Sequence, residues 1–201
     1  MSLIEPGSTA IFFGDSITDA GRRDDPDELG NGYVRLLTAE LADVRVLNAG
    51  ISGNRVVDLQ GRLDDDVLAQ QPDLVSIMIG INDTWRRFDS DDPTSTEAYE
   101  AGYRDVLTRI RDAGASAILL EPFVLPVTDE QATAWREDLD PRIEAVHRLA
   151  AEFAAPVVPL DVELNKLAAQ EGSAALAADG VHPTDRGHAE IARLWLATAS
   201  A

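Results

Sequence analysis

The stretch Thr9-Ala10-Ile11-Phe12-Phe13-Gly14-Asp15-Ser16 holds a mostly apolar run followed by a glycine, an aspartate and a serine. A short apolar run of this kind predicts a buried strand, and the Gly-Asp pair after it predicts a tight turn. Similar apolar runs recur along the chain. We predict strands at Thr9–Phe13, Val44–Asn48, Leu74–Ile79, Ala117–Glu121 and Val157–Leu160.

Longer segments with apolar residues at three- and four-residue spacing separate these runs, as Leu37 and Leu41 illustrate. This spacing predicts amphipathic helices. The predicted helices are Gly32–Leu41, Val56–Gln70, Ser95–Ala113, Glu130–Ala154 and Asp185–Ala199. Strands that alternate with helices predict an α/β fold built from βαβ units around a mostly parallel sheet.

Length and composition limit the classes of function. A chain of 201 residues that is 45% hydrophobic and 26% charged predicts one globular domain over residues 1–201. Lys and Arg total 17 against 36 for Asp and Glu, a net charge of −19, which opposes binding to nucleic acid, to an anionic membrane or to a polyanionic substrate.

The absence of cysteine excludes disulfides, thiolate metal sites and a cysteine nucleophile. The N-terminal residues show no signal-peptide pattern, and no apolar stretch reaches the roughly 18 residues of a membrane helix, so we expect a cytoplasmic protein. The composition and these sequence patterns indicate no partner other than a small molecule.

In an open parallel sheet, ligands bind beyond the carboxyl ends of the strands. Gly14-Asp15-Ser16 follows the first predicted strand, Asn48-Ala49-Gly50-Ile51-Ser52-Gly53 ends the second, and Gly80-Ile81-Asn82-Asp83 follows the third. These segments place a hydroxyl, a glycine-rich turn and a side-chain amide on one sheet edge. Such groups suit a serine nucleophile and an oxyanion hole, although the pattern alone does not choose between Gly50 and Gly53.

A serine nucleophile needs a base, and the chain has three histidines. His147 lies within a predicted helix among charged residues, and His188 begins the last helix, where we expect it to pack. His182 differs because Asp179 stands three residues before it in a loop and Pro183 follows it. The Asp179 carboxylate can then accept from one ring nitrogen of His182 and leave the other for Ser16.

Other motifs fit less well. Gly14-Asp15-Ser16-Ile17-Thr18 lacks the second glycine of a nucleophile elbow, which disfavours the common α/β-hydrolase fold. The acidic runs Asp24–Asp25, Asp64–Asp66 and Asp89–Asp92 lack the spacing of a calcium loop, so we interpret them as solvated surface. We therefore predict no metal site.

Four blocks, in this order, resemble the SGNH or GDSL hydrolase superfamily: Phe13–Asp19, Asn48–Asn54, Ile79–Asp83 and Asp179–Pro183. The stretches 14–22 and 75–86 are most similar to the bacterial intracellular acetylxylan esterases of that superfamily. The resemblance covers residues 9–198. It implies a three-layer α/β/α, flavodoxin-like sandwich with a five-stranded parallel sheet, no cofactor, and assembly into a homo-oligomer.

Carried over by position, the resemblance implies that Ser16 is the nucleophile, His182 the general base and Asp179 its orienting partner. It implies oxyanion donors on the backbone N–H of Ser16, the backbone N–H of Gly53 and the side-chain amide of Asn82.

Three further residues are candidates for substrate contact: Asp15, Trp85 and Arg86. For Asp15 a role in bracing the turn competes with substrate contact. For Trp85, a position in the hydrophobic core is as good an interpretation as contact with the substrate. Ala178 is a departure from the pattern, because in xylan-directed relatives an aromatic residue precedes the catalytic aspartate.

We therefore expect a carboxylic-ester hydrolase that removes short acyl groups, acetyl above all, from a carbohydrate such as xylo-oligosaccharide, through an acyl-enzyme on Ser16. A lysophospholipase, thioesterase or arylesterase would use the same residues with a different pocket. An acyltransferase would need an alcohol that outcompetes water. A catalytically silent carbohydrate-binding domain would keep the fold without the chemistry.

Overall fold

The computed structural model describes residues 4–200 and contains one five-stranded, fully parallel sheet. Its strands are β1 (Thr9–Gly14), β2 (Arg45–Gly50), β3 (Leu74–Met78), β4 (Ser116–Leu120) and β5 (Val157–Val158). The order across the sheet is β2-β1-β3-β4-β5. Together with the helices this confirms the predicted α/β fold and its five-stranded parallel sheet.

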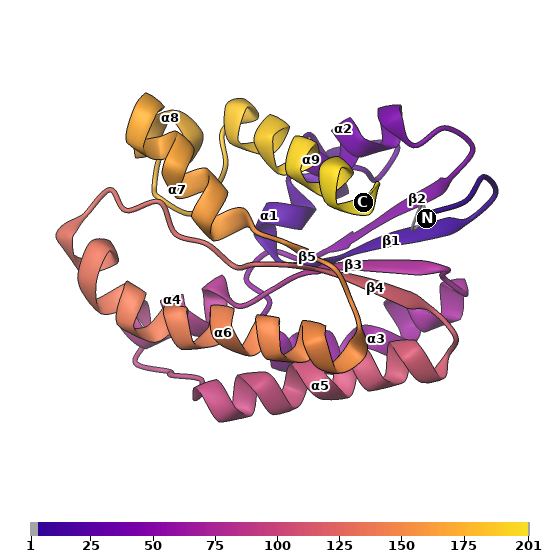
Figure 1. Ribbon diagram of the computed structural model, residues 1–201, viewed down its shortest axis with the longest axis horizontal. Helices are drawn as coiled ribbons and strands as arrows, with labels where there is room; N and C mark the ends of the chain where they lie inside the picture. Colours follow the sequence, from indigo (N-terminus) through magenta and orange to yellow (C-terminus); the bar gives the residue numbers. More distant parts are fainter. Residues whose placement is uncertain (1–3, 201) are drawn as a thin grey trace.

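Helices cover both faces of the sheet and give three layers (Figure 1). One face carries α1 (Ser16–Asp19), α2 (Tyr33–Glu40), α7 (Leu160–Glu171), α8 (Ser173–Leu176) and α9 (Asp185–Ala199). The other carries α3 (Val56–Asp66), α4 (Ile81–Asp89), α5 (Thr96–Asp112) and α6 (Arg136–Phe153). Short turns of helix lie at η1 (Arg22–Asp24), η2 (Leu68–Gln70) and the π-helix η3 (Gln131–Trp135).

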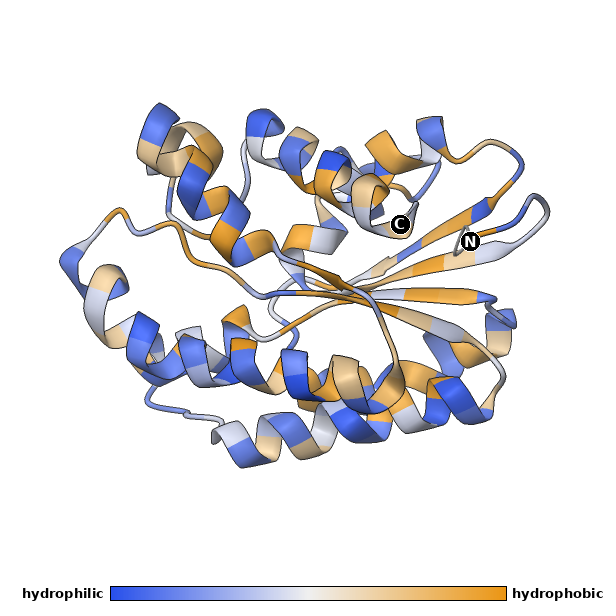
Figure 2. Ribbon diagram, viewed as in Figure 1, coloured by the Kyte–Doolittle hydropathy of each residue, from blue (hydrophilic) through white to orange (hydrophobic). Residues whose placement is uncertain are grey.

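The core lies on both sides of the sheet because successive strand residues point to opposite faces. Ala10 and Phe12 of β1 pack into the layer of α2 and α9, whereas Ile11 and Phe13 pack into the layer of α3 and α5. Apolar residues accordingly run along the strands and along the inner sides of the helices (Figure 2). A sheet buried on both faces explains why its strands read as nearly continuous apolar runs.

The predicted elements differ from the structure in three places. The predicted strand Val157–Leu160 is too long, because Pro159 cannot donate to a strand neighbour and Leu160 begins α7. The predicted helix Val56–Gln70 ends its α-helical part at Asp66. The prediction also omits α1, α4, α7 and α8, of which α1 and α8 are single turns with no room for a periodic pattern.

No helix within residues 4–200 is long and apolar enough to cross a membrane.

The turn from β1 into α1 depends on Asp15, which caps the helix. Its Oδ1 accepts the backbone N–H of Ile17 at 3.0 Å, while its Oδ2 has no partner among the described residues. The side chain is fully buried, and burial raises the pKa of Asp15 to about 7 against the hydrogen bond from Ile17. This placement fits a brace for the turn and does not fit contact with a substrate.

The centre of the sheet is joined to α9 by a buried hydrogen bond. Trp195 Nε1 donates to Ser76 Oγ of β3 at 2.9 Å, and both side chains are almost fully buried. The Trp195 ring also lies 5.4 Å from the ring of Phe12, measured between centroids. A polar pair in an apolar core stabilises the fold only while both partners are present.

We predict that Ser76→Ala lowers the free energy of unfolding by about 1–3 kcal/mol, because the indole N–H is left buried without an acceptor. Urea unfolding followed by circular dichroism measures this loss. Repeating Ser76→Ala in a Trp195→Phe background supplies the control, since the donor is then absent and the loss should shrink. An equal loss in both backgrounds would contradict a contribution from the hydrogen bond.

We predict that Asp15→Asn stabilises the protein more at about pH 8 than at about pH 5. The folded state holds a proton on Asp15 that the unfolded chain releases, so the stability contributed by this group declines as pH rises from about 3.8 to about 7. The difference grows by at most about 1.4 kcal/mol for each pH unit in that window. Urea unfolding at both pH values tests this, with Asp91→Asn as an exposed control. A pH-independent difference would contradict it.

Candidate active site

Ser16, His182 and Asp179 lie in one hydrogen-bonded row. Ser16 is the first residue of α1, and its Oγ lies 3.0 Å from Nε2 of His182. His182 stands in the loop between α8 and α9, and its Nδ1 lies 2.6 Å from Oδ2 of Asp179. In this order the imidazole can take the hydroxyl proton while the carboxylate fixes the ring and stabilises its charged form.

The Asp179 carboxylate is also held by its own loop. Its Oδ1 accepts the backbone N–H of Val181 at 2.9 Å and that of His182 at 2.7 Å. Burial alone would raise the pKa of Asp179, but the hydrogen bonds from the His182 ring and from these two N–H groups outweigh it and lower the pKa. Asp179 is therefore ionised at neutral pH and faces His182 as a negative charge.

Three N–H groups are candidate donors for a developing oxyanion. Within residues 4–200, the backbone N–H groups of Ser16 and Gly53 have no acceptor in the protein. Asn82 uses one hydrogen of its Nδ2 to reach the backbone oxygen of Asn54 at 3.1 Å, which leaves the second hydrogen for a ligand. Gly50 cannot serve in this way because its N–H donates to Asn48 Oδ1 at 2.9 Å, so the geometry favours Gly53.

The turn that carries Gly53 is tied to the helix that carries Ser16. Asp19 Oδ2 accepts both the backbone N–H of Ser52, at 3.0 Å, and its hydroxyl, at 2.8 Å. Arg62 of α3 donates to the backbone oxygen of Gly14 at 2.9 Å and to Asn54 Oδ1 at 2.7 Å. The sequence analysis missed the positioning roles of Asp19 and Arg62. Asp19 is the last residue of the block Phe13–Asp19 and shows no distinctive spacing from other polar residues, and Arg62 is one arginine on an ordinary helix.

Asp83 connects the turn to α4. Its carboxylate accepts the backbone N–H of Val56 at 3.2 Å and is fully buried. Burial raises the pKa of Asp83 to about 6, although the nearby positive charge of Arg142 lowers it. Because Asp83 follows Asn82 directly, this bond fixes the start of α4 relative to the start of α3.

Trp85 and Arg86 lie at the edge of this site. The ring of Trp85 is half-buried, with its centroid 5.7 Å from that of His182. The guanidinium of Arg86 lies beside Gly53, since a Cβ built on that glycine would be 3.9 Å from Arg86 Nη2. Arg86 also pairs with Asp89 on its own helix. Both side chains are therefore close enough to the row of three residues to remain candidates for substrate contact.

The other two histidines lie outside this row. His188 is buried, and its Nδ1 accepts the backbone N–H of Tyr33 at 3.2 Å. Burial lowers the pKa of His188 to about 4, so the ring is neutral. His147 of α6 lies 2.6 Å from Glu121 Oε1, measured from its Nε2. Each of these rings is engaged in a contact away from Ser16.

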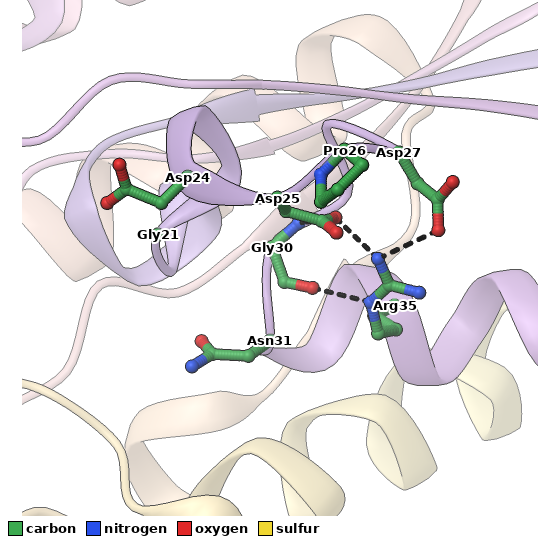
Figure 3. Close-up of a pocket in the computed structure, with 8 residues that line it drawn as sticks. All are labelled: Gly21, Asp24, Asp25, Pro26, Asp27, Gly30, Asn31 and Arg35. Atoms are coloured by element: carbon green, nitrogen blue, oxygen red, sulfur yellow. Dashed lines mark hydrogen bonds and ion pairs between the residues drawn. The ribbon is translucent and has the colours of Figure 1, made fainter.

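A cavity of about 540 Å³ lies beside the acidic run Asp24–Asp25 (Figure 3). Ser16, Asp179 and His182 do not line it. Arg35 of α2 pairs with Asp25, lies 3.3 Å from Asp27 Oδ2 and donates to the backbone oxygen of Gly30 at 2.7 Å. Asp25 also accepts the backbone N–H of Leu29 at 2.8 Å. Asp24 is exposed, as the interpretation of this run as solvated surface predicts, whereas Asp25 is partly buried and is a structural residue of the loop.

Within residues 4–200, no group of three or more histidine and acidic side chains is arranged to hold a metal ion.

The sequence matches the model of the GDSL-like lipase/acylhydrolase family over residues 12–190. An acetylxylan esterase from Geobacillus stearothermophilus is 37% identical over 208 aligned positions, which cover 96% of this chain and 94% of that protein. The resemblance stated from the sequence blocks, including the likeness to acetylxylan esterases, is confirmed.

Solved structures agree with the sequence comparisons. A variant of Axe2, an acetylxylan esterase from Geobacillus stearothermophilus, superimposes with a TM-score of 0.90 at 35% identity, covering 98% of this chain and 96% of that one. LAE5, described as an alpha/beta hydrolase enzyme from the metagenome of Lake Arreo, gives a TM-score of 0.92 at 33% identity, covering 100% of this chain and 98% of that one. Because family, relatives and fold agree over nearly the whole length, the chain belongs to the GDSL-like lipase/acylhydrolase family and is a carboxylic-ester hydrolase.

Proposed function

We propose that this protein is a serine esterase that removes acetyl groups from acetylated carbohydrate, with xylo-oligosaccharide as the favoured substrate class. The observation that carries the mechanism is the row from Ser16 Oγ through the His182 ring to the Asp179 carboxylate, with distances of 3.0 and 2.6 Å. The substrate class is supported by the relatives, which are described as acetylxylan and acetyl-xylooligosaccharide esterases.

The relative also supports the proposed roles. Three structures of Axe2 are described as catalytic mutants, in which a serine, an aspartate and a histidine are each replaced by alanine. The aspartate and histidine of that enzyme stand three positions apart, as Asp179 and His182 do. The same three residue types in the same spacing favour the same chemistry here.

In the proposed reaction, Ser16 Oγ attacks the carbonyl carbon of the acetyl ester while His182 Nε2 takes its proton. The carbonyl oxygen becomes an oxyanion, which accepts from the backbone N–H groups of Ser16 and Gly53 and from the side-chain amide of Asn82. When the intermediate collapses, His182 returns the proton to the sugar oxygen, and acetyl-Ser16 remains. Water then attacks this ester while His182 takes its proton, the bond between the acyl carbon and Ser16 Oγ breaks as His182 returns the proton to Oγ, and acetate leaves.

Ala178 marks where this chain departs from Axe2. In that enzyme a tryptophan, replaced by isoleucine in one structure, stands directly before the aspartate of the catalytic mutant. Here the exposed Ala178 offers no aromatic surface before Asp179. The half-buried ring of Trp85 beside His182 is the aromatic group that we propose for contact with the sugar or the acyl group. Arg86 beside Gly53 is the polar candidate.

We predict that the wild-type protein hydrolyses p-nitrophenyl acetate and releases acetate from acetylated xylo-oligosaccharide, with little activity on p-nitrophenyl octanoate. Ser16→Ala should abolish nearly all of this turnover. Ser116→Ala, at the opposite end of the strands, should keep it and serves as the matched control. Initial rates measured for the three proteins on the same substrates make the comparison.

Other outcomes would redirect the assignment. A preference for octanoate would favour a lipase or thioesterase, and a preference for aryl acetates without release from the oligosaccharide would favour an arylesterase. Acetyl transfer to an added sugar faster than hydrolysis would favour an acyltransferase. Failure of a fluorophosphonate to label Ser16 would favour a carbohydrate-binding domain without catalysis.

We predict that Asn82→Ala lowers kcat on p-nitrophenyl acetate by about 100- to 1,000-fold, because one donor to the oxyanion is lost. KM should change little, since that donor acts mainly on the transition state. Circular dichroism and the thermal midpoint show whether the variant remains folded after losing its bond to Asn54. A folded variant that retains more than a third of the wild-type kcat would remove Asn82 from the proposed oxyanion hole.

Two further expectations belong to this proposal. The resemblance to oligomeric esterases favours a homo-oligomer, which light scattering on the eluted protein would measure. A cytoplasmic location rests on the composition and sequence pattern, and cell fractionation would measure it.

A further inference from the structure

The loop that carries Asp179 and His182 has little regular structure of its own. It runs from the end of α8 to the start of α9, and a single antiparallel bridge between Ala177 and Pro183 closes its base. The Asp179 and His182 side chains are nearly half exposed, at 46% and 47%. Their position relative to Ser16 therefore depends on how the backbone of this loop is held against the rest of the protein.

Gln131, the first residue of the π-helix η3, holds that backbone from a distant part of the chain. Its Nε2 donates to the backbone oxygen of Asp179 at 2.8 Å. Its Oε1 accepts the backbone N–H of Val127 at 2.9 Å, so both ends of the amide are engaged. The side chain is buried, and its orientation is fixed by one bond on each side.

The next peptide of the loop is held in the same way. The backbone N–H of Leu125 donates to the backbone oxygen of Gly180 at 2.8 Å. Gly180 has a φ of +86°, and a Cβ there would lie 2.7 Å from Gln131 Oε1 and 2.8 Å from the backbone oxygen of Leu125. The glycine thus lets the loop lie directly against Gln131 and Leu125.

The π-helix η3 also contacts His182, the other residue of the pair, through intervening side chains. Trp135 at its end lies 5.3 Å from Trp85, and Trp85 lies 5.7 Å from His182, measured between ring centroids. One five-residue element thus reaches Asp179 directly through Gln131 and His182 indirectly through two tryptophans. A π-helix contains an extra residue that changes which side chains face one direction, and such segments occur often at functional sites.

We propose that Gln131 is a positioning residue for the Asp179–His182 pair, acting through its hydrogen bond to the backbone oxygen of Asp179. This inference rests on the proposed function, in which His182 exchanges a proton with Ser16. Loss of the Nε2 donor leaves a peptide oxygen without its partner and lets the loop shift. A displacement of about 1 Å can lower a rate by about 100-fold, because proton transfer requires close alignment.

We expect Gln131→Met and Gln131→Glu to lower kcat on p-nitrophenyl acetate by at least about 10-fold, with KM within about twofold of wild type. Methionine fills similar space without hydrogen bonds. Glutamate keeps the shape of the side chain and can still accept from Val127, and in its ionised form it cannot donate to Asp179, so it keeps the test open if the methionine variant does not fold.

Ser76→Ala is the matched control. It also removes a buried hydrogen bond, the one that Trp195 Nε1 donates to Ser76 Oγ at 2.9 Å, but in the centre of the sheet and not beside the loop of residues 177–183. We expect kcat within about twofold of wild type for this variant. An equal loss of kcat in Ser76→Ala and Gln131→Met would overturn the proposal in favour of general loosening.

A spectroscopic measurement separates this proposal from the proposed function. The proton between His182 Nδ1 and Asp179 gives a downfield NMR resonance, assigned by its loss in His182→Ala. We expect it to shift or broaden in both Gln131 variants and to remain in Ser76→Ala. A folded Gln131→Glu with wild-type kcat and an unchanged resonance would overturn the positioning role. An inactive wild-type protein would refute the proposed function alone, because the resonance would still report on Gln131.

Discussion

The site depends on the close approach of α1 to the ends of three parallel strands, which two glycines permit. A Cβ on Gly14 would lie 2.6 Å from Oγ1 of Thr18 in α1, and one on Gly50 would lie 2.2 Å from the backbone nitrogen of Asp19. Gly14 pairs with Gly50 on one side and with Met78 on the other, so the three strands end level. Any side chain at either glycine would displace α1, and with it the hydroxyl of Ser16 and the carboxylate of Asp19.

This approach also places polar groups where water is excluded, and the fold satisfies most of them locally. Asn48 donates to the backbone oxygens of Thr18 at 2.7 Å and Leu29 at 2.9 Å while it accepts from Gly50. Asp15 retains an oxygen without a partner among the described residues. Burial disfavours the charged form of this carboxyl group and so raises its pKa. The polar contacts therefore fix the position of α1. The sharp turn before α1 requires the burial of the Asp15 carboxyl group, which is unfavourable in free energy.

The sequence predicts those features that depend on neighbours along the chain. The strands can be predicted because both faces of the sheet are buried, and the Asp179–His182 pair can be predicted because the two residues stand three positions apart in one loop. The sequence leaves the choice between Gly50 and Gly53 open, and the hydrogen bonding favours Gly53, since only the structure shows Gly50 donating to Asn48. The roles of Arg62 and Gln131 could not be predicted, because the bonds of Arg62 to Gly14 and of Gln131 to Asp179 each span 48 residues and nothing in helical spacing indicates them.

The two halves of the site are held in place by different parts of the structure. Ser16 and Asn82 begin helices that leave the sheet, so the strand register sets their positions. Asp179 and His182 form a turn whose internal bonds span at most three residues, and both residues lie outside the helices and strands. Its internal geometry would survive a shift of the whole loop, yet the 3.0 Å separation between Ser16 and His182 would not. Contacts such as that of Gln131 with the Asp179 carbonyl therefore bear on catalysis, because they join a locally determined turn to a globally determined sheet edge.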